Sequence, residues 1–376
     1  MQYDLLLKGG MLIDSAQGIH ATKDIGFEDG IAAEMGDELD PSNATDVIDC
    51  SGSIVSPGWI DLHVHAFWGC SHYGIDPDPH LVAHGVTTAL DAGSAGADNF
   101  PGFRRFIIEK SDTRLFAYLH ISSQGLLSKE IGELKYMAYA NVEKAVEMVN
   151  QNRDVILGIK VRLTKSLIDP SAGIEPLYLA REAADALELP LMVHPNDAAC
   201  DSIDDILAVM NKNDILTHCF QGDGCGILDQ NNKIRVSVRE ARQRGVRFDV
   251  GHGQASFKWQ VAEHAIEQGF YPDTISSDLH IYNVNGPVFD MATTMGKFIY
   301  LGFALEDVLA KVTAYPARVL GMPDQIGTLK KGAVGDAVVF KMETGSFDFV
   351  DADQQLRTGS QRPVPTSVIR SGKIYR

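Results

Sequence analysis

VSPGWIDLHVH (residues 55–65) places a Pro-Gly turn before a short apolar run that ends in two histidines. The run predicts a β-strand over 59–65, because apolar strand-forming residues follow a turn signal. Successive strand side chains point to opposite faces, so His63 and His65 share one face at the end of this strand. Neutral imidazole is a good ligand for zinc and similar ions, although two histidines at this spacing also arise by chance.

The middle of the chain repeats this arrangement, with short β-rich runs followed by helical stretches such as REAADALE (181–188) and ARQRG (241–245). Eight such runs alternating with helices predict a (β/α)8 TIM barrel, which belongs to the α/β class. A doubly wound sheet is the alternative, but the sequence lacks its phosphate-binding glycine fingerprint after the first strand. The seven further predicted strands cover residues 86–93, 115–122, 155–163, 190–195, 214–222, 246–253 and 273–280.

The two ends of the chain resemble each other and differ from the middle. Each contains short, partly alternating apolar runs separated by Gly, Asn and Asp, which is typical of strands and turns. We therefore expect one small β-sandwich domain built from residues 1–54 and 325–376. The barrel domain would cover residues 55–324.

Ionisable residues lie at or near the ends of several predicted strands. In a barrel of parallel strands, the C-terminal ends open on one face, where catalytic groups gather. A single strand histidine is more often a structural residue, but the joint placement of several such groups indicates a metal site. The residues are His63, His65, Lys160, His194, His218 and Asp278.

The stretch VSPGWIDLHVH resembles the first-strand signature of the amidohydrolase superfamily, in which HxH follows a Pro-Gly turn. The type and order of Lys160, His194, His218 and Asp278 match the binuclear branch of that family. IGTLKKGAVGDAVVF (326–340) is similar to the family's return into its β domain. The resemblance, which is closest to dihydroorotase-like amidohydrolases and deacetylases, covers nearly the whole chain.

This resemblance implies a hydrolase with two divalent metal ions, for which zinc is the favoured identity. The more buried ion would be held by His63, His65 and Asp278, and the more exposed ion by His194 and His218. Lys160 would carry a CO2-derived carbamate that bridges both ions, because an ordinary lysine ammonium cannot bind a metal. Asp278 would also be catalytic, taking a proton as a metal-bridging hydroxide attacks and passing it to the leaving group.

Two residues narrow the expected substrate. Dihydroorotases carry an arginine two residues after the second histidine, and this chain has Phe67 there. Arg162 lies two residues beyond Lys160 on the same strand face, so it can pair with a substrate carboxylate or form a structural ion pair. We expect hydrolysis of an amide or ester bond in a small acyl carboxylate, either an N-acyl amino acid or an O-acyl hydroxy acid.

Other readings of the function stay open at this stage. A cyclic amide hydrolase (dihydroorotase- or hydantoinase-like) and an adenine-type deaminase are the enzymatic alternatives. A non-enzymatic assembly protein is disfavoured because all six ligand positions are filled. Additional candidates for substrate contacts are His252, His280 and Tyr282.

Composition limits the partners. The net charge of −17, from 33 basic and 50 acidic residues, argues against nucleic acid as a partner. No apolar run reaches the roughly 18 residues that a membrane span needs. Five cysteines without a CxxC pair favour a reducing compartment, so we expect a cytoplasmic enzyme of small molecules. The resemblance and the frequency of symmetric assemblies predict a homo-oligomer.

Overall fold

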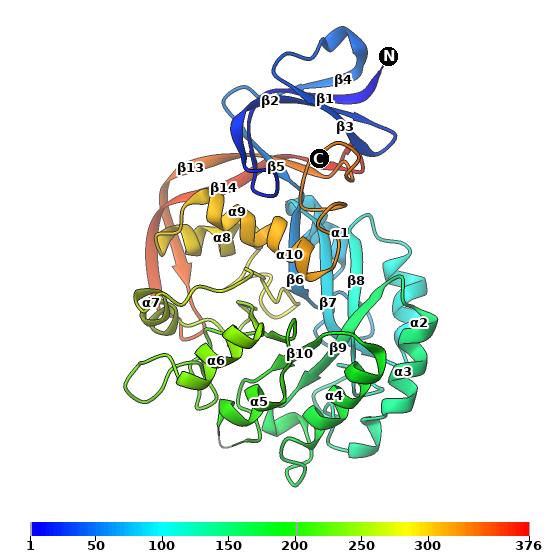
Figure 1. Cartoon of the computed structure of the whole chain (residues 1–376), viewed down its shortest axis with the longest axis vertical. Helices are drawn as coiled ribbons and strands as arrows, with labels where there is room; N and C mark the ends of the chain where they lie inside the picture. The colour runs from blue at the N-terminus through cyan, green and yellow to red at the C-terminus, as the bar shows by residue number, and fades with distance from the viewer. Residues whose placement is uncertain (1, 201, 376) are drawn as a thin grey trace.

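A curled parallel sheet occupies the centre of the molecule, and a second, mostly antiparallel sheet lies at one end (Figure 1). The computed structural model describes residues 2–200 and 202–375. Neighbouring strands of the central sheet are all parallel, as βαβ crossovers require. These strands are β6 (Trp59–Val64), β7 (Val86–Gly96), β8 (Arg114–His120), β9 (Ile156–Arg162), β10 (Leu191–His194), β11 (Ile215–Leu216) and β12 (Arg247–Phe248).

The eighth predicted strand, residues 273–280, differs from the expectation, because it forms no regular strand in the described structure. It closes the barrel through two isolated parallel bridges, Asp249–Thr274 and Val64–Leu279. The backbone N–H of His65 also donates to the Leu279 carbonyl at 3.0 Å. The predicted (β/α)8 barrel is therefore confirmed, with an irregular segment in its last strand position.

The helices lie outside the central sheet (Figure 1). Those before α7 alternate with the strands of this sheet along the chain. The predicted helical stretches 181–188 and 241–245 overlap helices α4 and α6. No helix in residues 2–200 and 202–375 is long and apolar enough to cross a membrane. The helices are α1 (Pro77–His80), α2 (Phe100–Phe103), α3 (Val142–Gln151), α4 (Glu175–Leu187), α5 (Ile203–Val209), α6 (Val236–Arg244), α7 (Trp259–Glu267), α8 (Met291–Tyr300), α9 (Leu305–Val312) and α10 (Ala314–Val319).

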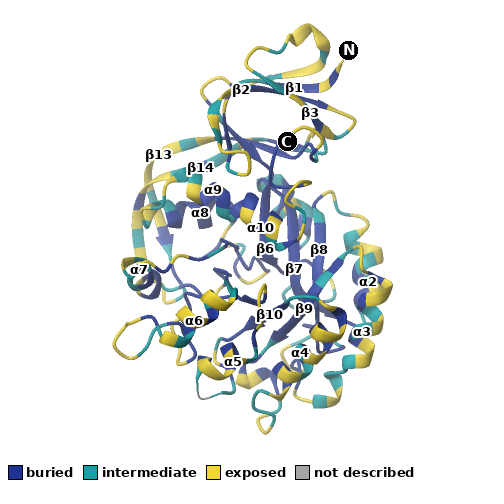
Figure 2. Cartoon of the chain, viewed as in Figure 1, coloured by how far each residue is buried: buried dark blue, intermediate teal, exposed yellow. Residues whose placement is uncertain are grey.

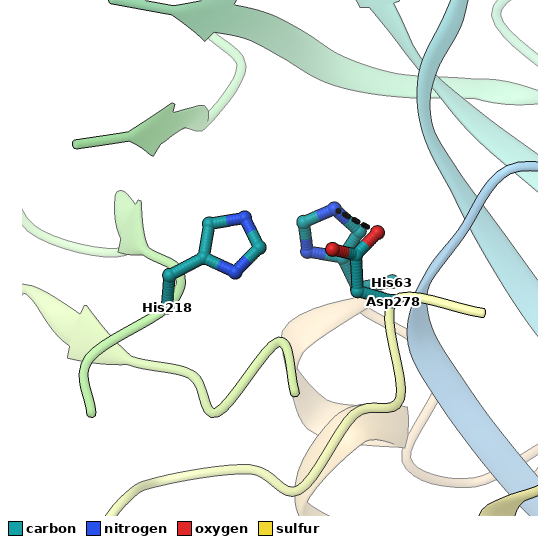
Figure 3. A group of neighbouring side chains, drawn as sticks. All are labelled: His63, His218 and Asp278. Atoms are coloured by element: carbon teal, nitrogen blue, oxygen red, sulfur yellow. Dashed lines mark ion pairs between the residues drawn. The ribbon is translucent and has the colours of Figure 1, made fainter. Parts of the chain in front are cut away.

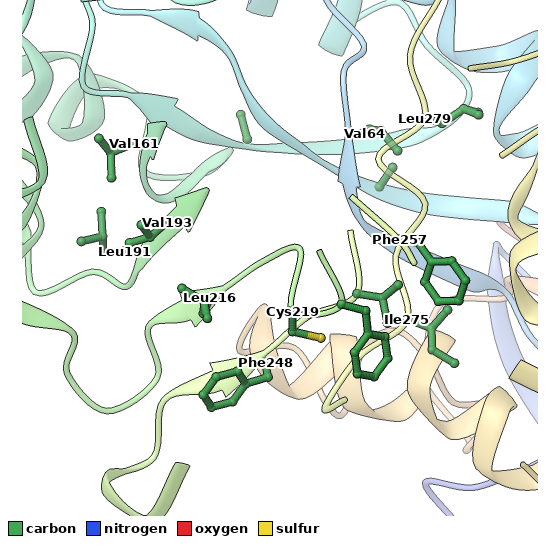
Figure 4. Close-up of a cluster of buried hydrophobic side chains, with 14 of the residues drawn as sticks. Val64, Val161, Leu191, Val193, Leu216, Cys219, Phe248, Phe257, Ile275 and Leu279 are labelled. Carbon is green, nitrogen blue, oxygen red and sulfur yellow. The ribbon is translucent and has the colours of Figure 1, made fainter. Parts of the chain in front are cut away.

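Alternation along the barrel strands decides which side chains reach the interior. Phe116 and Tyr118 of β8 and Met192 of β10 belong to one inner apolar cluster. His120 and His194 continue the same alternation at the ends of these strands, so they face the same interior. The barrel strands are buried, whereas the helices expose their outer faces (Figure 2). Figure 4 shows side chains of the outer apolar cluster, among them Val161, Leu191, Val193 and Leu216.

The second sheet is built from both ends of the chain, as predicted. Its strands follow the order β15-β14-β13-β5-β1-β2-β3, and β4 pairs with β1. The division into domains of residues 1–54 with 325–376 and residues 55–324 stays a prediction. The strands are β1 (Tyr3–Asp14), β2 (Ile19–Glu28), β3 (Ile31–Gly36), β4 (Ala44–Asp49), β5 (Ile54–Pro57), β13 (Ala337–Val350), β14 (Leu356–Arg370) and β15 (Lys373–Ile374).

The long hairpin of β13 and β14 runs from this sheet down the side of the barrel, next to α8 (Figure 1). Its tip is hydrogen-bonded to the start of α7. Trp259 donates its backbone N–H to Asp351 Oδ2 at 3.0 Å and its indole N–H to the Gln355 carbonyl at 3.1 Å. The hairpin thus connects the terminal sheet with the loop that precedes α7.

Lys297 of α8 is fully buried and joins three segments of the chain. Its Nζ lies 2.6 Å from His252 Nε2, 2.9 Å from the Pro287 carbonyl and 2.6 Å from the Val350 carbonyl. An ammonium group has three N–H donors, so these three acceptors satisfy it completely. One buried donor therefore links three segments of the chain, at His252, Pro287 and Val350.

Replacing Lys297 by methionine should destabilise the protein, because three buried acceptors lose their donor. We expect a loss of about 3 kcal/mol and a decrease in Tm of roughly 5 °C. Thermal unfolding followed by circular dichroism measures this decrease. The exposed Lys331→Met is the matched control and should unfold like the parent protein. Equal Tm values for the two variants would contradict a structural role for Lys297.

Candidate active site

The six predicted metal ligands lie at the C-terminal end of the barrel. This placement follows from the parallel sheet, which brings the ends of all its strands to one face. Each of the six residues is at most 8% exposed. They are His63 in β6, Lys160 in β9, His194 at the end of β10, and His65, His218 and Asp278 in the irregular segments after β6, β11 and α7.

Asp278 lies between the histidines of the first strand. Its Oδ1 is 3.2 Å from His65 Nε2 and 3.5 Å from His63 Nε2. One ligand atom each of His63, His218 and Asp278 lie within 4.8 Å of one another, and Figure 3 shows these three side chains converging from separate segments. This group has the composition and spacing of a metal site.

His194 and Lys160 complete the cluster. The ring centroid of His194 is 4.2 Å from that of His218. Lys160 Nζ lies 3.5 Å from His63 Nε2 and 3.4 Å from Met192 Sδ, and neither partner is a carboxylate. Burial lowers the pKa of Lys160 to about 8, which favours the neutral amine far more than in an exposed lysine.

Two of the six residues have a backbone conformation that strands do not adopt. His218 has φ of 60° and Asp278 has φ of 49°, both in the left-handed region that side chains disfavour. This conformation ends regular strand pairing, which explains why the predicted strands 214–222 and 273–280 are short or irregular. A Cβ atom at Gly253 would collide with the Asp278 carboxylate, so glycine is required beside it.

Hydrogen bonds determine which nitrogen of each ring faces the site. Thr217 donates its hydroxyl hydrogen to Asp249 Oδ2 at 2.9 Å, so it must accept from His63 Nδ1 at 2.8 Å. His218 Nδ1 lies 2.6 Å from the Gly251 carbonyl, which can only accept. Both rings therefore carry their hydrogen on Nδ1 and direct the Nε2 lone pair towards the cluster, as metal-binding histidines do.

The four histidines of the cluster are neutral. Burial lowers the pKa of His63, His65 and His194 well below the usual value. Burial also lowers the pKa of His218 to about 3. Neutral imidazole is the form that binds a metal ion.

Three buried atoms of the cluster have no hydrogen-bond partner among the described residues: His194 Nε2, His218 Nε2 and Asp278 Oδ1. Unsatisfied buried polar atoms are rare in native proteins and require an explanation. Imidazole nitrogen and carboxylate oxygen are the ligand types of zinc and similar divalent ions. The residues at the end of the barrel therefore fit a metal centre.

A cavity of about 220 Å³ opens beside the cluster. Four of the six candidate ligands line this cavity, so a small molecule in it would contact the candidate metal centre directly. They are His65, Lys160, His194 and Asp278. Its further lining includes Tyr73, Arg162, Thr164, Asn196, Ser256 and His280.

Arg162 is the cationic group of this cavity beside the ligand cluster, as the strand alternation predicted. Its Nε donates to Thr164 Oγ1 at 3.1 Å and its Nη1 to the Tyr73 hydroxyl at 3.3 Å. Nη1 is also 3.4 Å from Glu133 Oε1. Burial acts to lower the pKa of Arg162, but the charge of Glu133 and the contacts with Tyr73 outweigh burial and raise it. Arg162 is thus ionised at the edge of the cavity.

Sequence reasoning missed Glu133, the buried partner of Arg162. His120 Nδ1 accepts from the Ser122 N–H at 2.9 Å, so its Nε2 donates to Glu133 Oε2 at 3.1 Å. Burial acts to raise the pKa of Glu133, but Arg162 and His120 outweigh burial and lower it. Glu133 lies in the long irregular segment after β8, where no periodic pattern marks a buried carboxylate.

The three remaining candidates for substrate contacts have different positions. His280 lines the cavity, with its ring 4.7 Å from that of Tyr73. Tyr282 is 44% exposed and lies outside the cavity lining, with its ring 5.6 Å from that of Tyr73. His252 requires a correction, because it is fully buried and its nitrogens face the Gly253 carbonyl and Lys297. Lys297 lies 45 residues along the chain, so sequence alone could not show this pairing.

A barrel with buried histidines, a carboxylate and a lysine at its C-terminal face defines the class of metal-dependent hydrolases. The model of the amidohydrolase family matches residues 54–375, and the chain belongs to this family. The family is generally metal-dependent, and its members act on small molecules by hydrolysis. The expected resemblance to dihydroorotase-like amidohydrolases is therefore confirmed.

The individual relatives have different names. A protein of Enterococcus faecalis named deacetylase is 37% identical over 379 residues, which cover 100% of both chains. The crystal structure of an adenine deaminase is 35% identical, covers 99% of each chain and has a TM-score of 0.92. The crystal structure of a dihydroorotase is 33% identical, covers 98% of this chain and 97% of the other, and has a TM-score of 0.89.

The buried pair of Glu133 and Arg162 can be tested for energetic coupling. Glu133→Gln leaves a buried guanidinium without its counter-charge and should cost about 3 kcal/mol of unfolding free energy. Arg162→Met should also destabilise, while the double variant should be more stable than the sum of the single losses predicts, by more than about 1 kcal/mol. Urea unfolding measures these values.

The matched control for this cycle is the exposed pair Lys23–Asp37, in which Asp37 is 82% exposed. Asp37→Asn should leave the urea midpoint nearly unchanged, because exposed ion pairs contribute little. Additive effects of Glu133→Gln and Arg162→Met would show that the two charges do not interact.

Proposed function

We propose that the protein hydrolyses the amide or ester bond of a small acyl carboxylate, as a deacetylase would. The observation that carries this proposal is the ionised Arg162 in the same cavity as the ligand cluster. An arginine can bind a carboxylate through charge-assisted N–H donors. Among the described residues, the hydrogen bonds of Arg162 use Nε and Nη1, so the donors of Nη2 are left for a ligand.

We assign the ligand roles as the family resemblance implies. His63, His65 and Asp278 would hold one divalent ion, and His194 and His218 a second, with zinc as the favoured metal. Lys160 would bridge them as a carbamate, which fits its position beside His63.

The chemistry divides between the metal ions and the side chains. Bound divalent ions supply Lewis-acid activation of water and of the scissile carbonyl. Asp278 would accept the proton of the attacking water on its carboxylate and deliver it to the leaving nitrogen or oxygen. Its Oδ1 is buried and has no hydrogen-bond partner in the described part of the chain, so it is available to accept this proton.

Arg162 and His280 would orient the substrate. Arg162 would hold the carboxylate through its ionised guanidinium. His280 accepts from the Tyr282 N–H at its Nδ1, at 3.2 Å, so its Nε2 carries the hydrogen and can donate to a substrate in the cavity. Tyr282 would contact only substrates that extend beyond the cavity.

The enzymatic alternatives have support from the named structures. A ring amide would be the substrate of a dihydroorotase-like enzyme, and adenine that of a deaminase. Phe67 argues against a dihydroorotase-like activity, because it stands where dihydroorotases have an arginine. Its ring centroid lies 4.8 Å from that of Phe103, and it is not among the residues that line the cavity. A homo-oligomer and a cytoplasmic location stay predictions.

Loss of Lys160 should remove both metal and activity. Lys160→Met should reduce the metal content from about two ions per chain to one or fewer, and kcat by more than about 1,000-fold, because metal activation of water is lost. Elemental analysis and hydrolysis of N-acetyl amino acids and O-acetyl hydroxy acids measure these effects. The exposed Lys110→Met is the control.

A parent protein that hydrolyses only a ring amide, or only deaminates adenine, would replace the proposed function by that alternative. A parent protein without bound metal and with an unmodified Lys160 would support the non-enzymatic reading.

Arg162→Met should lower kcat/KM only for substrates that carry a carboxylate. For an N-acetyl amino acid, we expect kcat/KM to fall by about 100-fold, because a charge-assisted hydrogen bond to the carboxylate is lost. The same substrate with a neutral carboxamide in place of the carboxylate should lose less than about threefold. Steady-state kinetics with both compounds measures the difference. Equal losses for the two compounds would exclude a carboxylate contact.

A further inference from the structure

Asn196 lines the cavity and has a buried side-chain oxygen that is unpaired among the described residues. It follows His194 by two residues and lines the same cavity as Arg162 and the ligand cluster. Its side-chain Nδ2 donates to Ser256 Oγ at 2.9 Å. Its Oδ1 is buried and has no hydrogen-bond partner among residues 2–200 and 202–375. None of the roles assigned above uses this oxygen.

The orientation of Asn196 is linked to that of Arg162. Thr164 Oγ1 donates to the backbone carbonyl of Asn196 at 3.0 Å and accepts from Arg162 Nε at 3.1 Å. The two strands are also adjacent, since His194 pairs with Arg162 and Thr164 forms a bridge with Ala198. The side-chain oxygen of Asn196 and the guanidinium of Arg162 are therefore held on neighbouring strand ends.

A buried carbonyl oxygen without a partner is unfavourable, and a ligand that brings a donor removes this cost. A substrate whose carboxylate binds Arg162 carries its scissile group one carbon away. In an N-acyl α-amino acid that position is an amide N–H, whereas in an O-acyl hydroxy acid it is an ester oxygen without hydrogen. Only the amide can satisfy Asn196.

We propose that Asn196 is a specificity-determining residue, whose Oδ1 accepts a hydrogen bond from the scissile amide N–H and selects N-acyl amino acids over O-acyl hydroxy acids. This inference rests on the proposed hydrolysis of acyl carboxylates. Sites that hydrogen-bond a substrate N–H discriminate against analogues that lack it, because the buried group of the site is then left unpaired. Asn196 therefore resolves a choice that Arg162 leaves open, since both substrate classes carry a carboxylate.

The experiment compares a matched pair of substrates, an N-acetyl amino acid and the O-acetyl hydroxy acid with the same side chain and configuration. The measured quantity is the ratio of kcat/KM for the amide to kcat/KM for the ester within each variant. This ratio cancels differences in folding, in active-enzyme concentration and in carboxylate binding. It also removes the higher intrinsic reactivity of esters when variants are compared with the parent.

Two nearly isosteric substitutions separate the possible roles. Asn196→Leu removes the acceptor and should lower the amide-to-ester ratio by about tenfold, the value of one good hydrogen bond. Asn196→Asp keeps an acceptor oxygen and should leave the ratio within about threefold of the parent. Asn231→Leu, an exposed substitution outside the cavity, is the control and should not change the ratio.

An unchanged ratio in Asn196→Leu would overturn the inference while both substrates are still hydrolysed. An equal decrease in Asn196→Leu and Asn196→Asp would also overturn it, because the amide nitrogen would then be the group that contacts substrate. If the metal-loaded parent hydrolyses neither substrate, the proposed function fails, and the assignment of Asn196 fails with it.

Discussion

Four imidazoles, one carboxylate and one amine are buried together at the end of the barrel. Burial removes most of the solvation that would stabilise a charged form of each group. Burial lowers the pKa of the histidines, so the rings stay neutral and each has one lone pair. Thr217 and the Gly251 carbonyl occupy the Nδ1 side of His63 and His218 and leave Nε2 inward. A cluster of inward lone pairs favours a bound cation, which supports the metal centre proposed for these residues.

A second group of polar side chains lies beside the ligand cluster, and we propose that it binds the substrate. Glu133 neutralises Arg162 from the protein side, and His120 in turn holds Glu133. The guanidinium can therefore be buried and charged before a substrate arrives, which lowers the cost of binding an anion. Asn196 adds an uncharged acceptor on the neighbouring strand end. In the proposed function, Arg162 binds the carboxylate of the substrate, and Asn196 distinguishes an amide from an ester.

The terminal sheet is connected to the active-site end of the barrel by direct contacts. The β13–β14 hairpin bonds to Trp259, and its Val350 carbonyl shares Lys297 with His252. His252 in turn precedes Gly253, which lies against the Asp278 carboxylate. The position of a candidate catalytic carboxylate thus depends on packing that involves the far end of the chain.

Most of the fold and the position of the six predicted ligands at one end of the barrel followed from the sequence, whereas the strand lengths near the site did not. The runs 214–222 and 273–280 are rich in strand-forming residues, so each is predicted to be a full strand. The left-handed backbone at His218 and Asp278 nevertheless ends regular pairing there. A residue with φ near +50° leaves no periodic signature, so local pattern could not reveal it.

The sequence by itself determined the alternation of strands and helices and placed the six predicted ligand residues at strand ends. This was possible because strand period and chain order already specify which side chains reach the open end of a parallel barrel. Only the tertiary structure decided that Glu133 pairs with Arg162, that Lys297 contacts His252, and that Asn196 Oδ1 has no hydrogen-bond partner within the described part of the chain. These are contacts between segments far apart in the chain or in irregular loops, and their energies depend on burial and distance, which local sequence does not encode.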